Sequence, residues 1–503
     1  MHLSVTTTRE TELKFDCDPE ATLPPLDLPA TDEHEVVLRA VYWETGDKRL
    51  MRWGASLRHR TASDHSEDGW TLKLGVPSVD VVDGVTRDEV TADGASNEPP
   101  AHLVDAVRAL TLGQALQPQA TITTRRHIRR LGTDMESPVV EVADDLVRSS
   151  LLGTDGPTFR QVEVELLDPD GIETLRAVGK RLSAQGLSPS SHGSKVEQVL
   201  GGPLDGPFDV ARLTKRSTVA DLVPLVIGGG AKRLVSADPM VRTTDDPEAV
   251  HEARKAIRDL RSQLKMLRPL LDRERIRAVR AELKWIGQLL GDLRDVHVLG
   301  AMFEDQLSSL DVSDDGGADD IRRRLADQAA FRRNLVASAL SGDRYVSLLI
   351  ALEELVADPP FRDDVALDTS ARAFMRRSGR KSWKRSTRAR RHLGSPAEAT
   401  ELHELRKDVK QSRATAKAAQ LARLDSKRFT ARAGDLKDEL GDHHDTIVWM
   451  DWLRQHHDRF GADGAFLAGR LHEDADGRRR ELERTWPAAW KAVSTGKSTG
   501  WMH

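Results

Sequence analysis

Polar and apolar positions alternate with a period of two along much of the first 200 residues. The alternation is clear at Glu10, Glu12 and Lys14 and again at Glu163 and Glu165. A period of two is that of a β-strand, and turn-rich stretches between such runs are typical of antiparallel hairpins. The pattern predicts a large antiparallel sheet. Helices are expected within this half at residues 100–116, 121–131 and 171–185.

The period changes beyond about residue 217, where apolar residues recur at spacings of three and four. One such stripe, which predicts a helix, consists of Ile257, Leu260, Leu264, Leu267 and Leu271. Residues 201–207 between the two halves are dense in glycine and proline, as is common at a domain boundary. The sequence therefore predicts an α+β protein with an N-terminal domain at 1–205, a linker at 206–216 and an all-helical domain at 217–503.

The helical half contains an internal repeat of basic residues. At relative positions 0, 3, 4, 7, 10 and 14, one copy has His251, Arg254, Lys255, Arg258, Arg261 and Lys265, and the other has His403, Arg406, Lys407, Lys410, Arg413 and Lys417. We therefore expect a bundle of two helical repeats, at about residues 217–370 and 371–503.

Each copy presents its basic residues on one side of a helix, because these positions fall within an arc of about 120°. Like charges three and four residues apart repel by a few tenths of a kcal/mol per pair, so the stripe does not stabilise the helix. A polyanionic partner explains it better. Nucleic acid is the less favoured partner, because the stripe has almost no aromatic residues for base stacking, whereas inorganic polyphosphate needs none.

The net charge of −5 hides a difference between the two halves. Residues 1–210 carry 21 Lys and Arg against 35 Asp and Glu, and the remaining residues carry 54 against 45. Such an asymmetry is a functional signal, and it agrees with a basic, polyanion-binding second half.

The single cysteine, Cys17, excludes an internal disulfide and a cysteine-bound zinc site. The N-terminus has no basic segment followed by an apolar stretch, and no apolar run approaches the roughly 20 residues that span a bilayer. We therefore expect a soluble, cytoplasmic protein without a membrane partner.

Several strands of the N-terminal half place charged side chains on one face, which is unusual for a packed sheet. Solvated outer faces explain any one strand, but a polar-lined closed sheet explains the set better. Carboxylate oxygens are the ligands that Mg²⁺ or Mn²⁺ prefers, and arginine and lysine bind phosphate. The candidate carboxylates are Glu10, Glu12, Glu89, Asp145, Glu163 and Glu165, and the candidate bases are Arg58, Arg60, Lys73, Arg87, Arg125 and Arg126.

The segment Glu10-Thr11-Glu12-Leu13-Lys14 resembles the ExExK motif of the CYTH superfamily, the triphosphate tunnel metalloenzymes. The segments Trp70–Leu74, Arg87–Glu89 and Glu163–Glu165 follow in the family's order, and the resemblance covers about residues 4–200. It implies an eight-stranded antiparallel tunnel that binds a triphosphate and a divalent metal. The chain departs from the family at Trp43 and Glu44, where tyrosine and aspartate are common, and this blurs the choice of substrate.

The resemblance also implies roles for single residues. Phosphate would be held by Lys14, Arg58, Arg60, Lys73, Arg87 and Arg125 or Arg126, with Lys195 as a weaker candidate. Glu10 and Glu12 would bind the first metal ion, and Glu163, Glu165 and Asp145 would serve a second metal ion or the attacking water, with Glu89 as a further ligand. The expected catalytic set is Glu10, Glu12, Lys14, Glu163 and Glu165.

The second half resembles a CHAD domain, a helical module of paired repeats that is often fused after a CYTH domain. The segments that carry the resemblance are His251–Lys255, Gly291–Asp295, His403–Lys407 and Gly441–Asp445. It implies binding of inorganic polyphosphate along the basic surface between the repeats, with Arg294 added to the stripe residues. We favour hydrogen bonding to phosphate over metal binding for the histidines of the stripe.

The preferred hypothesis is metal-dependent hydrolysis of inorganic tripolyphosphate or a related triphosphate in the tunnel, with polyphosphate binding by the helical domain. Two alternatives stay open. The chain could be a polyphosphate-binding or granule-associated protein whose tunnel is vestigial, or an adenylate cyclase, since the family includes such members. We expect the protein in the cytoplasm, in association with polyphosphate granules, whether it is a triphosphatase or a polyphosphate-binding protein with a vestigial tunnel.

Overall fold

The computed structural model describes residues 6–20, 23, 25–26, 28–75, 85–95, 97–132, 137–310 and 316–503. The chain divides into two compact units, whose boundary in the sequence lies between Pro207 and Phe208. Residues 238–244 group with the first unit. Each unit is described by itself.

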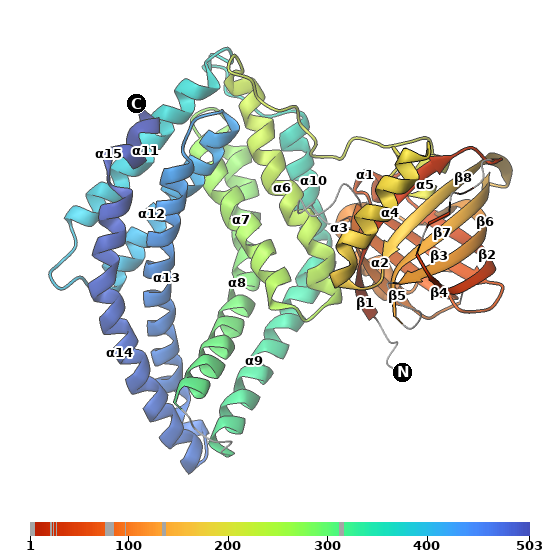
Figure 1. Cartoon of the computed structure of the whole chain (residues 1–503). Helices are drawn as coiled ribbons and strands as arrows, with labels where there is room; N and C mark the ends of the chain where they lie inside the picture. The colour runs from red at the N-terminus through yellow and green to blue at the C-terminus, as the bar shows by residue number, and fades with distance from the viewer. Residues whose placement is uncertain are drawn as a thin grey trace. The chain divides into compact units, whose positions relative to one another are not determined.

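Eight long strands form the first unit, and they close into a barrel (Figure 1). The sheet order is β5-β4-β3-β2-β6-β7-β8-β1, and β1 also pairs with β5, so no edge is left between them. All these pairings are antiparallel, which confirms the expected eight-stranded tunnel. The strands are β1 (Thr6–Cys17), β2 (Ala30–Glu44), β3 (Ser56–Ala62), β4 (Gly69–Gly75), β5 (Val85–Ala92), β6 (Gln117–Gly132), β7 (Pro138–Leu151) and β8 (Thr154–Leu166), and the two-residue β9 (Ser188–Pro189) pairs with β1.

Short helices decorate the barrel. They are α1 (Arg49–Arg52), α2 (Ala101–Ala106), α3 (Arg108–Thr111), α4 (Ile172–Ala184) and α5 (Lys195–Val199). The helices expected at 100–116 and 171–185 are present as α2 with α3 and as α4. The helix expected at 121–131 is wrong, because this segment lies inside β6 and its side chains alternate between buried and more exposed positions from Thr121 to Ile128.

Compared with an ordinary packed barrel, the distribution of side chains is reversed: apolar side chains lie on the outer surface, and most of the interior lining is charged. On β7 and β8, Val142 and Val164 point outward and pack with Val178 of α4 in one buried cluster. The alternate positions, Glu163 among them, point inward because successive side chains of a strand take opposite faces. Glycine at 179 leaves room for the side chain of Leu13, which would lie 2.5 Å from a Cβ atom there, so α4 can lie close against β1.

The second unit consists of helices (Figure 1). Asp246 caps the helix α7 by accepting a hydrogen bond from the Glu248 N–H, with proline at the first helical position. The long helices are α6 (Val219–Thr243), α7 (Pro247–Leu267), α8 (Arg273–Ser309), α9 (Gly316–Ser341), α10 (Asp343–Ala357), α11 (Ala371–Arg391), α12 (Ala399–Leu421), α13 (Lys427–His456) and α14 (Ala462–Val493), followed by the short α15 (Gly496–Thr499).

Within the described residues, no single helix combines the length and apolar character needed to cross a bilayer. The pair α9 and α10 meets the requirement only when the two helices are taken together, and they are bent by 58° at their junction.

Candidate functional site: the charged tunnel and the basic helical stripe

The interior of the barrel holds a cavity of about 300 Å³ whose walls are mostly charged. Most residues that the sequence singled out come together here. Those that line the cavity are Glu10, Lys14, Arg58, Arg60, Lys73, Arg87, Glu89, Arg126, Glu163, Glu165 and Lys195. Glu12 and Asp145 lie directly behind this wall, at 2% and 0% exposure, and bond to residues that line it.

Arg125 does not belong to the site. It lies on β6 next to Arg126, and neighbouring residues of a strand point to opposite faces. The side chain of Arg125 is 63% exposed and lies 4.0 Å from Glu35, whereas the Arg126 side chain is buried in the tunnel. Of the two expected alternatives, Arg126 is therefore the one that the structure brings to the cavity.

Three carboxylates form a row across adjacent strands. Glu165 of β8 pairs in register with Glu12 of β1 on one side and with Glu141 of β7 on the other. Like charges directly opposite each other destabilise a sheet. Burial, together with the charge of Glu10, raises the pKa of Glu165 to about 8. Glu12 pairs with Lys14 and Arg87 and Glu141 pairs with Arg130, whereas Glu165 forms no ion pair within the described ranges.

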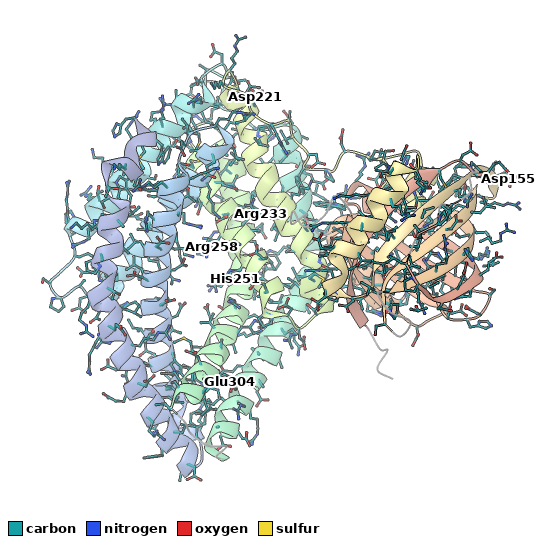
Figure 2. The ribbon with its side chains drawn as sticks, in the orientation of Figure 1. Asp155, Asp221, Arg233, His251, Arg258 and Glu304 are labelled. Atoms are coloured by element: carbon teal, nitrogen blue, oxygen red, sulfur yellow. The ribbon has the colours of Figure 1, made fainter. Side chains whose placement is uncertain are left out.

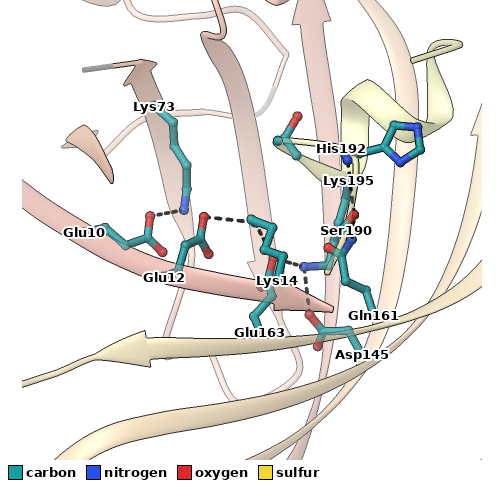
Figure 3. A network of polar contacts seen from close by, with 12 residues as sticks. Glu10, Glu12, Lys14, Lys73, Asp145, Gln161, Glu163, Ser190, His192 and Lys195 are labelled. Atoms are coloured by element: carbon teal, nitrogen blue, oxygen red, sulfur yellow. Dashed lines mark hydrogen bonds and ion pairs between the residues drawn. The ribbon is translucent and has the colours of Figure 1, made fainter. Parts of the chain in front are cut away.

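A second cluster of ion pairs is balanced, and Figure 3 shows Lys14 and Lys195 of this cluster beside Glu163. Glu163 is 2.5 Å from Lys14, 2.6 Å from Lys195 and 2.8 Å from Arg126. Arg126 also makes two hydrogen bonds to Asp145, of 2.8 and 2.7 Å. Although burial opposes the charged form, the attraction of Lys14 and Lys195 holds the pKa of Glu163 well below its usual value.

Lys73 of β4 pairs with carboxylates from two other strands. Its ammonium nitrogen lies 2.5 Å from both Glu10 of β1 and Glu89 of β5. Burial opposes ionisation of Glu89, but Lys73 and Arg58 attract its charged form and lower its pKa to about 2. Glu89 is therefore a fixed anion that holds Lys73.

Three arginines form the positive wall of the cavity. Arg58 and Arg60 lie two residues apart on the same face of β3, and Arg126 comes from β6. Burial and the nearby charges of Arg58 and Arg126 lower the pKa of Arg60 to about 9. Arg58 donates to the Tyr42 hydroxyl at 3.3 Å, and Arg60 contacts Glu67. An anion between these guanidinium groups would relieve their mutual repulsion.

In the helical unit, the basic residues of α7 and α12 face one another. Figure 2 marks His251 and Arg258 on α7. Burial, and repulsion from cations that include Arg406 and Arg413 of α12, lower the pKa of Arg258. Burial with repulsion from Arg406 and Arg258 lowers the pKa of Lys410 to about 7. The two halves of the repeat thus create a concentration of positive charge between them.

Other stripe residues have local partners. Arg254 lies 2.8 Å from Asp295 and Arg406 lies 3.7 Å from Asp445, so the two copies use equivalent carboxylates. Lys255 and Lys407 each pair with the glutamate three residues earlier. Arg294 approaches the Pro247 carbonyl at 3.5 Å, and the ring of His403 lies 4.3 Å from that of His444. The remaining stripe residues are Arg261, Lys265 and Lys417, and burial lowers the pKa of each.

Two protein families match the chain, one on each unit. The CYTH domain matches residues 8–199, and the CHAD domain matches residues 226–454. The chain is a CYTH–CHAD fusion.

The CYTH–CHAD chain is 29% identical over 444 residues to the uncharacterized proteins MT2285 and Rv2226 of two Mycobacterium tuberculosis strains, covering 83% of this chain and 82% of theirs. A solved CHAD domain from the plant Ricinus communis covers 57% of the chain and 94% of its own length, at 22% identity and a TM-score of 0.47. PptA from Streptomyces chartreusis covers 55% and 100%, at 18% identity and a TM-score of 0.46.

The CYTH tunnel contains functional candidates that sequence reasoning missed. Glu141, Arg130, Glu67 and Tyr42 also line the cavity. Arg130 was hidden by the wrong helix at 121–131; read as a strand, β6 places Arg126 and Arg130 on one face, four residues apart. Glu141 stands two strand positions before Ala143 and four before Asp145, so the same alternation that indicated Asp145 also indicates Glu141.

The residues of the CYTH tunnel fit a divalent metal ion, and the CYTH family uses such ions. Glu10, Glu12, Glu141 and Glu165 supply the hard oxygen ligands that Mg²⁺ or Mn²⁺ takes, and Glu165 is the one of the four that forms no ion pair within the described ranges. Asp145 and Glu163, also expected as ligands, both pair with Arg126 and Lys195 in the metal-free structure.

In the CHAD domain, His251 lies with Glu248 and Glu252, and one ligand atom from each lies within 4.8 Å of the others. Glu252 is also 2.5 Å from Lys255. This group resides at the exposed start of α7, away from the buried part of the stripe.

Proposed function

We propose that the CYTH tunnel hydrolyses inorganic tripolyphosphate or a related triphosphate with the help of Mg²⁺ or Mn²⁺. The observation that carries the proposal is the division of charge within one cavity. Glu165, which forms no ion pair within the described ranges, shares the cavity with Arg60, whose pKa is lowered by burial and by the charges of Arg58 and Arg126. A phosphate chain bound together with a metal ion satisfies both groups.

Each group has a distinct task in the proposed reaction. Arg58, Arg60 and Arg126 bind the phosphate oxygens and neutralise the charge that is redistributed as the phosphoryl group transfers. Bound at the carboxylate row, the metal ion would supply Lewis-acid neutralisation of the phosphoryl oxygens. In the metal-free protein, a pKa of about 8 keeps Glu165 mostly protonated at neutral pH; Glu165 would lose this proton when it serves as a ligand of a metal ion bound at the row.

Lys14 and Lys195 have a positioning role in this scheme. Both hold Glu163, which in turn bonds to Arg126. This network fixes the orientation of the Arg126 guanidinium. Two of its N–H groups donate hydrogen bonds to Asp145, and because the group is planar, the directions of its other N–H groups are then fixed as well. The binding geometry is therefore set before substrate arrives.

Phosphate release from tripolyphosphate tests the proposal, first with Mg²⁺ and then with Mn²⁺. The native chain is expected to release phosphate, and Glu12→Gln to lose at least 100-fold of that activity while keeping its fold. A native chain that is inactive on tripolyphosphate, ATP and thiamine triphosphate would contradict hydrolysis. Cyclic AMP formed from ATP in the same assay would identify a cyclase instead.

Polyphosphate binding is the function proposed for the CHAD stripe. It is supported by the cations gathered between α7 and α12, of which Arg258 and Lys410 have pKa values lowered by burial and by repulsion from neighbouring cations. A linear polyanion lying between the helices relieves this repulsion along the whole stripe. On this basis the protein is proposed to be cytoplasmic and to associate with polyphosphate granules.

Retention on a polyphosphate column tests this second function. Arg258→Ala with Lys410→Ala should elute at clearly lower salt than the native chain, because two of the most crowded cations are lost. Arg275→Ala with Arg277→Ala, on the exposed start of α8, removes the same charge elsewhere and should elute with the native chain. Equal elution of both variants would argue against a binding stripe. A protein that stays diffuse in polyphosphate-rich cells would argue against granule association.

A further inference from the structure

A separate basic pocket lies in the helical unit, at the C-terminal end of α7. Its volume is about 420 Å³, within the range of roughly 300–1,000 Å³ that is usual for small-molecule sites. Among the described residues that line it, none is acidic. Its rim carries six cations: Lys265, Arg268, Arg273, Arg362, Lys381 and Arg385.

The floor of this pocket is polar and closed. Ser382, Gln411 and Thr415 form it, and their exposed fractions are 5%, 6% and 1%. Ser382 and Thr415 each donate a hydrogen bond to a carbonyl of their own helix, so their oxygens keep lone pairs but offer no proton to the pocket. The cations on the rim must therefore provide most of the binding to any ligand.

Most of the rim cations form no ion pair with a carboxylate of the described residues. Arg362 pairs with Asp364 at 2.6 Å, but over the described ranges no carboxylate forms an ion pair with Lys265, Arg268, Lys381 or Arg385. Burial and repulsion from Arg385 also lower the pKa of Lys265. Such a group of unneutralised cations around one cavity is the pattern expected of an anion site.

The walls of the pocket are held in place without a ligand. The Asp272 N–H donates to the Pro360 carbonyl at 2.8 Å, and the Arg362 N–H donates to the Leu270 carbonyl at 3.1 Å, which ties the segment after α10 to the turn between α7 and α8. Gln411 of α12 donates to the Ser262 carbonyl of α7 at 3.0 Å. A prearranged site loses less entropy when a charged ligand binds.

We infer that this pocket binds a compact, multiply charged phosphate: a short inorganic oligophosphate, or the terminal segment of a longer chain. Lys265 belongs both to the α7 stripe and to the pocket, so a chain that lies along the stripe can end there. The six-cation rim matches a ligand of high charge density, and the closed floor sets a limit on its length. The inference rests on phosphate recognition by the helical unit but not on hydrolysis in the tunnel.

Binding of tripolyphosphate to the full-length chain in EDTA tests the inference, with calorimetry giving the number of sites and their affinities. Lys381→Ala with Arg385→Ala removes two rim cations of α11. Lys384→Ala with Arg388→Ala is the matched control, because both residues are exposed on the same helix and neither lines the pocket. All four positions lie outside the tunnel, so the tunnel contributes equally to every measurement.

The rim variant is expected to lose one tripolyphosphate site or to bind there at least ten-fold more weakly, while the control stays within two-fold of the native chain. Equal weakening in both variants, or no change in the rim variant, would overturn the inference. A failure of the stripe instead shows as unchanged column retention of Arg258→Ala with Lys410→Ala, and a failure of hydrolysis shows as no phosphate release, so the three outcomes are separable.

Long polyphosphate distinguishes the two sources of the ligand. If the pocket takes the end of a chain, the rim variant binds free-ended polyphosphate more weakly than the native chain, and this difference disappears when both chain ends are blocked by amide coupling. If it takes free short oligophosphate, the difference is confined to tripolyphosphate. A difference that persists with blocked ends would mean that internal phosphates enter, and would overturn the compact ligand.

Discussion

Glu12 and Glu165 lie directly opposite each other on neighbouring strands of the tunnel, and their surroundings differ. Glu12 is 2.9 Å from Lys14 and 3.3 Å from Arg87. Within the described ranges, Glu165 forms no ion pair, and its pKa is raised to about 8 by burial and by Glu10. One carboxylate is therefore neutralised by the protein and the other is left for an added cation.

Replacing Glu165 by glutamine should stabilise the metal-free protein at high pH. The folded-state pKa lies above the ordinary value, so the ionised group costs stability increasingly as the pH rises from about 4.5 to 8. Thermal unfolding in EDTA should show a variant more stable than the native chain at pH 9 and equal to it at pH 4. The variant should also lose the stabilisation by Mn²⁺ and at least 100-fold of the hydrolysis. An advantage that is independent of pH would contradict the assignment.

Arg60 of β3 lines the cavity, whereas Arg125 of β6 lies on the outer surface of the barrel, so the two arginines offer a matched comparison. Arg60→Ala should raise the KM for tripolyphosphate and lower kcat/KM by about 100-fold, since one charge-assisted contact to a phosphate is worth roughly 1.5–3 kcal/mol. Arg125→Ala removes the same charge from the outer surface, where the side chain is 63% exposed, and should change kcat/KM by less than two-fold. Steady-state kinetics check both. Equal losses would mean that overall charge, rather than the cavity, governs binding.

The sequence allowed the tunnel to be predicted from strands whose own alternation of charged and apolar residues is clear. Glu10, Glu12 and Lys14 show the alternation within five residues, and all face one interior. It failed at residues 121–131, because Arg125, Arg126, Arg129 and Arg130 recur at spacings that also suit a helix. Only pairing with β2 and β7 settles that segment as a strand.

Other features depend on contacts between distant segments. The row formed by Glu12, Glu141 and Glu165 exists only in the register of three strands, and no local pattern specifies that register. The basic pocket likewise joins residues from Lys265 to Thr415, which come from α7, the start of α8, α11, α12 and the segment that follows α10. The internal repeat predicted the facing stripes, but it could not predict a pocket that lies at one end of only one of them.

Two adjacent aspartates of β7, Asp144 and Asp145, allow the stability contributed by a buried ion pair to be compared with that of a more accessible one. Asp145 is fully buried and pairs with both Arg126 and Lys195, so Asp145→Asn should cost about 3–5 kcal/mol, because Glu163 alone would then face these two cations and Lys14. Asp144 pairs with Arg160 with similar geometry on the outer face, where both side chains are 15% exposed, and Asp144→Asn should cost about 1 kcal/mol. Urea unfolding of the tunnel domain checks the difference. Equal costs would contradict the special role of the buried cluster.

Binding of polyphosphate should take up a proton at Lys410. Burial, Arg406 and Arg258 lower the pKa of Lys410 to about 7 in the free protein, and a polyanion raises it toward the ordinary value of 10.5. The favourable contribution is therefore complete below pH 7 and is lost as the pH rises toward the pKa of the bound state. The nearby His444 does not interfere, since burial and His403 lower its pKa to about 4, so that it stays neutral throughout.

Calorimetry at pH 8 in buffers of different ionisation enthalpy measures that proton directly. The native chain should take up close to one proton per bound stripe, and its affinity should fall by up to ten-fold per pH unit between pH 7 and 9. Lys410→Arg keeps its charge in this range, so it should bind without proton uptake at this position and with a much flatter pH profile. Lys407→Gln serves as the control, because Lys407 is 55% exposed and already pairs with Glu404, and it should keep the native pH dependence. A native profile as flat as that of Lys410→Arg would show that Lys410 is charged before the polyanion arrives, and that the repulsion between the two stripes is relieved in some other way.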